Sequence, residues 1–158
     1  MRLAIVRIAA VALLAGWGTV AMAMGSSTPS TTDAPKADSD YTKAEKAIKA
    51  QDYKGAIPLL EQVVAKQPKN ADAFNYLGYA HRKLGEKEKA QTYYETALDI
   101  DPNHLGANEY MGELYLEMDN LPGAEARMAV LDKACRNCME KRELREAIEK
   151  FKSKGKAS

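Results

Sequence analysis

From residue 41 onward, apolar side chains recur every three or four residues, which is the spacing of one face of a helix. Two successive runs place their packed side chains at Phe74, Leu77, Ala80, His81 and Leu84, and then at Ala90, Tyr93, Tyr94, Ala97 and Leu98. Gly85 follows the first run and Asp101-Pro102 follows the second, and both are signals that end helices. The pattern therefore predicts two helices joined by a short turn.

This helical pair repeats along the chain with a period of 34 residues. The equivalent positions include Gly78 and Gly112, Leu77 and Met111, Pro68 and Pro102, Ala56, Ala90 and Ala124, and Val63, Ala97 and Leu131. A period of this size indicates stacked supersecondary units that bury a shared core. We therefore expect an all-α solenoid with units at residues 40–70, 71–104 and 105–134.

Residues 71–104 resemble the tetratricopeptide repeat (TPR). They match its large aromatic, its Leu-Gly pair, its small residues, its second aromatic and its closing proline with Phe74, Leu77-Gly78, Ala90, Ala97, Tyr94 and Pro102. The flanking units match less fully, since Asp40 and Lys43 depart from the motif and Asn108 replaces its aromatic. The resemblance implies a TPR-type α-solenoid of about three helix-turn-helix repeats.

A further amphipathic segment at residues 139–152 places Leu144, Ala147, Ile148 and Phe151 on one helical face. An apolar face backed by charged residues is typical of the helix that caps a solenoid. Residues 153–158 are expected to form a flexible tail. With two cysteines just before this helix, the chain resembles small exported bacterial TPR proteins that carry a cysteine pair there.

The N-terminus has the layout of a secretory signal peptide at residues 1–23. Arg2 and Arg7 precede an apolar run at 8–20, which is too short to span a bilayer comfortably. The small residues of Ala21-Met22-Ala23 favour cleavage between Ala23 and Met24. The alternative is an uncleaved membrane anchor. Cleavage predicts a protein that is exported without stable membrane insertion, in the periplasm or otherwise outside the cell.

The net charge bears on the function of the chain that remains after cleavage, and the composition bears on the order of its first residues. Cleavage removes two arginines and no acidic residue, so the formal net charge falls from +1 to −1, which does not suggest nucleic-acid binding. Residues 24–39 are rich in Ser, Thr, Pro and Asp and are expected to be disordered, because they carry too few large apolar side chains to form a core.

The two cysteines of the chain, Cys135 and Cys138, stand as a CxxC at the corner formed by residues 135–138. Attachment of a c-type haem would require a histidine where Met139 stands. A zinc site would need further ligands, and His81 and His104 lie in or beside another repeat. A structural disulfide is the default for an oxidising compartment. A redox role stays open as an alternative.

The remaining residues form no catalytic constellation, and we expect neither enzymatic activity nor a metal or other cofactor. If the chain is a TPR domain, the resemblance places its binding residues on the first helix of each unit, facing a concave groove. The corresponding residues are Tyr41, Glu45, Ile48 and Lys49, then Asn75, Tyr79, Arg82 and Lys83, then Glu109, Glu113, Leu116 and Glu117.

The three glutamates of the last set follow one another at four-residue intervals and predict an acidic stripe. Arg82 and Lys83 should face it, so we expect a ligand with basic residues over the third unit and acidic or polar residues near the second. The favoured function is a non-catalytic envelope adaptor that binds a protein or peptide. The alternatives are a thiol-disulfide oxidoreductase, or an accessory of one, and a structural subunit that self-associates.

Overall fold

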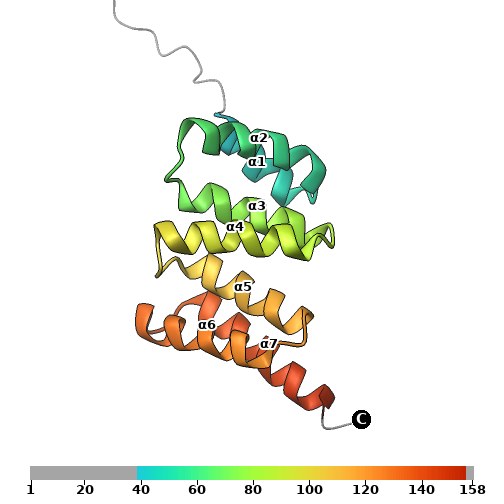
Figure 1. Ribbon diagram of the computed structural model, residues 1–158, viewed down its shortest axis with the longest axis vertical. Helices are drawn as coiled ribbons and strands as arrows, with labels where there is room; N and C mark the ends of the chain where they lie inside the picture. The colour runs from blue at the N-terminus through green and yellow to red at the C-terminus, as the bar shows by residue number, and fades with distance from the viewer. Residues whose placement is uncertain (1–38, 156–158) are drawn as a thin grey trace, which may run out of the picture. The chain divides into compact units, whose positions relative to one another are not determined.

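The computed structural model describes residues 39–155, and this part of the chain contains helices and no strand (Figure 1). The helices are α1 (Asp40–Lys49), α2 (Tyr53–Lys66), α3 (Ala71–Lys83), α4 (Lys87–Ile100), α5 (Leu105–Glu117), α6 (Leu121–Ala134) and α7 (Met139–Gly155). Three helical pairs followed by a last helix confirm the all-α solenoid. The signal peptide, the cleavage point at Ala23 and Met24, most of the leader and the end of the tail lie outside the described residues.

Side chains at equivalent repeat positions fix where the helices begin. Asn70 and His104 cap α3 and α5 by accepting hydrogen bonds from the backbone N–H groups of Ala73 and Ala107. Asp52 and Asn120 cap α2 and α6 in the same manner. Such caps satisfy backbone donors that the first turn of a helix leaves free. The 34-residue period therefore extends to the caps of α2, α3, α5 and α6, whereas Glu86, at the equivalent position before α4, makes no side-chain cap.

The observed ends of the helices agree with those predicted from the sequence, except at the C-terminal end of α7. Gly85 adopts a φ of +80°, the left-handed conformation that ends α3. α1 forms at residue 40 although Asp40 and Lys43 depart from the repeat motif. The expected capping helix at 139–152 continues to Gly155, so three residues assigned to the tail are helical. No helix in the described range is long and apolar enough to cross a membrane.

Consecutive helices pack side by side through residues 39–155 (Figure 1). Within the second unit, Gly78 of α3 allows close approach of the Tyr94 ring, and a Cβ added at Gly78 would lie 2.5 Å from two ring carbons. Gly112 of α5 occupies the equivalent position, but a Cβ there would lie 2.6 Å from Leu144 of α7. The last helix is therefore packed directly into the third unit.

Candidate protein-interaction groove

α1, α3 and α5 carry the residues that the TPR resemblance placed on the groove. Lys49, Lys83 and Glu117 are exposed, and Tyr41, Glu45, Ile48, Tyr79 and Glu113 are partly buried. Asn75, Arg82, Glu109 and Leu116 are at most 9% exposed. The predicted set therefore divides into side chains with accessible surface and side chains that are largely covered.

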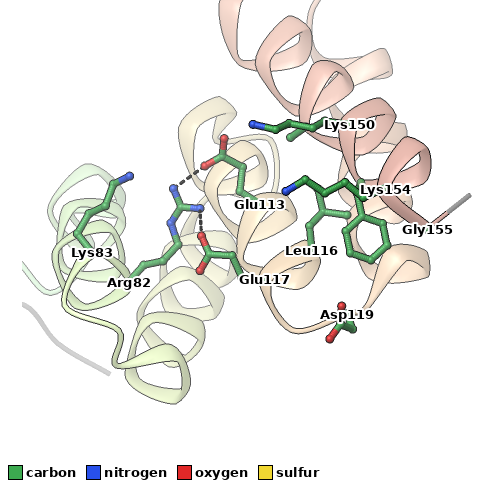
Figure 2. A pocket seen from close by; sticks show the side chains of 11 residues that line it. Arg82, Lys83, Glu113, Leu116, Glu117, Asp119, Lys150, Lys154 and Gly155 are labelled. Atoms are coloured by element: carbon green, nitrogen blue, oxygen red, sulfur yellow. Dashed lines mark hydrogen bonds and ion pairs between the residues drawn. The ribbon is translucent and has the colours of Figure 1, made fainter. Parts of the chain in front are cut away.

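Arg82 links the second unit to the third. Its guanidinium binds the carboxylates of Glu113 at 2.5 Å and Glu117 at 3.0 Å, as the dashed lines in Figure 2 show. The guanidinium also lies 6.0 Å and 5.7 Å from the ring centres of Tyr79 and Tyr110, within the range of cation–π contacts. Because Arg82 is only 7% exposed, the ion pair is an internal connection between α3 and α5.

Glu109 does not belong to an exposed acidic stripe, and that prediction is wrong. The residue is 3% exposed, and its burial raises the pKa of its carboxyl to about 9, with further increases from a hydrogen bond to Glu143 and from the charge of Glu113. The group is therefore protonated and neutral at pH 7. Only two carboxylates of the expected stripe remain, and both bind Arg82.

Tyr53, Tyr76 and Tyr110, which the sequence reasoning missed, contact the predicted tyrosines Tyr41 and Tyr79. The ring centres of Tyr41 and Tyr76 lie 6.0 Å apart, those of Tyr53 and Tyr79 5.9 Å apart, and those of Tyr79 and Tyr110 4.9 Å apart. Tyr76 and Tyr110 are separated by 34 residues, so the repeat register could have identified them. Aromatic side chains with large contact area are the common anchors of protein interfaces.

A pocket of about 670 Å³ lies where the C-terminal ends of α3 and α5 meet α7 (Figure 2). Arg82, Lys83, Glu113, Leu116, Glu117 and Asp119 line one side, and Ala147, Lys150, Phe151, Lys154 and Gly155 line the other. The predicted site held no residue of α7. The amphipathic pattern predicted that α7 would pack on the solenoid, but it contained no signal for packing beside the groove.

Cys135 and Cys138 are paired in the structure, and their Cα atoms lie 6.0 Å apart, within the range found for disulfides. They occupy the turn between α6 and α7, and neither lines the pocket. Among the described residues, no three histidine, cysteine, aspartate or glutamate side chains are grouped so as to hold a metal ion.

Two family models described as tetratricopeptide repeat match the chain, one over residues 41–105 and the other over residues 88–148. The chain is also similar to the protein CTR9 homolog of Arabidopsis thaliana, with 32% identity over 72 residues. That match covers 46% of this chain and 7% of the relative. The chain thus spans less than a tenth of the length of this relative.

Two solved structures illustrate the similarity in three dimensions. MamA from Desulfovibrio magneticus RS-1 is 28% identical, with a TM-score of 0.52 over 60% of this chain and 52% of that one. The type III secretion chaperone SycD of Yersinia enterocolitica, in complex with a peptide of the translocator YopD, shares the fold. It is 18% identical, with a TM-score of 0.64 over 73% of this chain and 92% of that one.

The two family models together extend over residues 41–148, which include α2 to α6 entirely and most of α1 and α7. The matched region therefore covers the three helical pairs that the 34-residue period predicts and the first part of the helix that follows them. The family match supports a role in protein–protein interaction. The chain belongs to the tetratricopeptide repeat family.

Proposed function

We propose that this protein is a non-catalytic adaptor of the cell envelope, which binds a segment of a partner protein in the groove formed by α1, α3 and α5. The observation that carries the proposal is the set of contacting tyrosines on α1, α3 and α5, joined by Tyr53 of α2, together with the exposed lysines Lys49 of α1 and Lys83 of α3. Aromatic anchors surrounded by charges suit the recognition of a polypeptide segment. The SycD chaperone, which has the same fold and was solved in complex with a peptide, supports a polypeptide segment as the partner.

The groove is tested by affinity capture from the native envelope, followed by quantitative mass spectrometry. Bait carrying Lys49→Ala and Lys83→Ala should lose the partner that the wild-type bait enriches. Bait carrying Lys54→Ala and Lys133→Ala is the matched control, because it loses two exposed lysines from α2 and α6. Equal capture by both variants would place the partner on another surface.

The envelope location rests on the signal-peptide pattern at residues 1–23, with Arg2 and Arg7 before a short apolar run and Ala21-Met22-Ala23 after it. The exported protein should begin at Met24, and N-terminal sequencing checks this. A protein that retains Met1, or that fractionates with the membrane, would contradict the proposed release.

The cysteine pair is proposed to be a structural disulfide in the exported protein. It lies at the corner that leads into α7, where a covalent link would hold the start of this helix. Replacement of both cysteines by serine should leave partner capture intact. The alternative oxidoreductase would instead exchange disulfides with a client or behave as a strong oxidant against glutathione, and either result would replace the adaptor proposal.

A further inference from the structure

The groove presents charges different from those that the sequence suggested, and the difference changes the expected ligand. Two of the three glutamates of α5 are bound to Arg82 and the third is buried. The exposed lysines at this end of the groove are Lys83 on α3 and Lys150 and Lys154 on α7. None of these three has an ion-pair partner within residues 39–155.

We propose that the pocket between α3, α5 and α7 binds an acidic polypeptide segment that carries one large apolar side chain. This inference rests on the proposed function and specifies the chemistry of its partner. The apolar side chain would enter the pocket, and the acidic residues on either side of it would approach the lysines at its edges.

The apolar part of the proposal rests on the residues between those edges. Leu116 of α5 and Phe151 and Ala147 of α7 line the pocket and belong to one hydrophobic cluster built around Leu144 and Ile148. Phe151 and Ala147 are only partly buried, so both retain apolar surface that a ligand could cover. A volume of about 670 Å³ is ample for one large side chain and part of its backbone.

The acidic part rests on the arrangement of charge across the pocket. Figure 2 shows the side chains of Lys150 and Lys154 reaching into the pocket from α7, with Lys83 on the opposite side. The lining includes four cationic and three acidic side chains, and Arg82 binds two of the acids. Asp119 is the remaining acid. The α7 edge of the pocket is therefore positive, and Lys83 is the exposed cation of the opposite edge, where Arg82 compensates one unit of the charge of Glu113 and Glu117.

The groove next to the pocket continues the same sign of charge. Lys49 and Lys83 occupy the same repeat position, 34 residues apart, and both are exposed. At the third such position Glu117 is bound to Arg82. A basic segment would meet Lys83, Lys150 and Lys154 and would have to compete with Arg82 for Glu113 and Glu117, whereas an acidic segment would find exposed cations along its path.

The experiment pans a random 12-residue peptide library displayed on phage against the mature protein. The peptides enriched should contain several Asp or Glu residues and one large apolar residue. Synthetic peptides from this set are then measured by fluorescence anisotropy. Lys150→Glu with Lys154→Glu should weaken binding by about tenfold or more, mainly through slower association. The matched control, Lys54→Glu with Lys133→Glu, should bind as the wild type does.

Two further variants test the apolar anchor and exclude a general charge effect. Phe151→Ala should weaken binding of the acidic peptide, and replacing the large apolar residue of the peptide by serine should have a similar effect. Circular dichroism establishes that each variant is folded. Equal affinity of the wild type and the Lys150→Glu, Lys154→Glu variant would overturn the proposal.

The panning result also separates this inference from the proposed function. Enrichment of basic peptides that compete with the captured partner would overturn the acidic-segment proposal and leave groove binding intact. Enrichment of no peptide, together with partner capture that is unaffected by Lys49→Ala and Lys83→Ala, would contradict both.

Discussion

The second and third repeats contain the same glycine but fill the space beside it differently. Tyr94, from the second helix of the same unit, packs over Gly78. In the third unit the repeat counterpart of Tyr94 is Met128, which is only partly buried, and Leu144 of α7 packs over Gly112 instead. The second unit therefore closes with its own residues, whereas the third requires the last helix.

This comparison gives α7 two roles. Leu144 and Ile148 join α7 to the core of the third unit, and Phe151 with the neighbouring lysines forms one side of the pocket. In a solenoid each unit contacts only its neighbours, so loss of a terminal contact should affect the adjoining unit most. Substitutions at equivalent positions of the two units can test this difference.

The largest effect is expected from truncating the side chains that pack over the glycines. Tyr94→Ala and Leu144→Ala each remove a fully buried side chain. Losses of about 3–5 kcal/mol and about 2–5 kcal/mol in the free energy of unfolding are typical for such changes. Chemical denaturation followed by circular dichroism measures both values.

The distribution of the damage should differ between these two variants. Tyr94 packs in the cluster shared by α4 and α5, so its loss should destabilise the middle of the solenoid. Leu144→Ala should increase amide hydrogen exchange in α7 and α5 and leave α1 to α3 protected. If hydrogen exchange instead rose in all helices of the Leu144→Ala variant, the contact made by α7 would stabilise the whole solenoid rather than the third unit alone.

A smaller effect is expected at the glycines themselves. In Gly78→Ala the new methyl group would meet the ring of the fully buried Tyr94, so we expect a loss of about 1–3 kcal/mol. In Gly112→Ala it would meet the terminal methyl groups of Leu144, which can rotate away. The gain of about 1 kcal/mol in helix propensity should offset most of that clash. Denaturation midpoints that fall equally in both variants would contradict the distinction.

The sequence predicted the features that depend on local pattern and on the period. Gly78, Gly112 and the helix pairs follow from spacing alone, and the same register leads from Tyr76 to Tyr110. It did not predict which side chain covers Gly112, because Leu144 comes from a helix outside the repeat. The prediction named Arg82, Glu113 and Glu117 as groove residues but did not identify their pairing, which depends on the distance between two helices.

A disulfide between Cys135 and Cys138 would support the dependence of the third unit on α7. Loop entropy suggests a contribution of about 2 kcal/mol for so short a ring. Replacing both cysteines by serine should therefore lower the thermal midpoint modestly, and exchange should increase first at the start of α7. Reductant should reproduce this change in the wild type and have no effect on the double variant. An insensitive wild type would argue against the disulfide.

A pH-dependent difference concerns a buried position at which the two units differ in chemistry. Asn75 of α3 and Glu109 of α5 are repeat counterparts, and both are buried. Burial and the neighbouring Glu143, Glu113 and Glu140 raise the pKa of Glu109 from 4.5 to about 9. An amide at this position carries no charge, whereas a carboxyl must keep its proton to stay neutral.

The sign of the pH dependence follows from this raised pKa. Below pH 4.5 the carboxyl of Glu109 is protonated in both the folded and the unfolded chain, so its stability contribution is fully present. As the pH rises toward 9, the unfolded chain releases this proton and the folded chain retains it, so stability is progressively lost. The slope from this one group is at most about 1.4 kcal/mol per pH unit.

Glu109→Gln should remove this slope by placing a neutral amide where the second unit has Asn75. The variant should gain stability relative to the wild type as the pH increases from 5 to 9, and denaturant unfolding at several pH values measures the difference. Glu149→Gln, which alters an exposed carboxylate of α7, is the matched control and should parallel the wild type. If Glu109→Gln also paralleled the wild type, the folded and the unfolded chain would release the Glu109 proton at similar pH values. The third unit would then carry a charged carboxylate at the position where the second unit carries the neutral amide of Asn75.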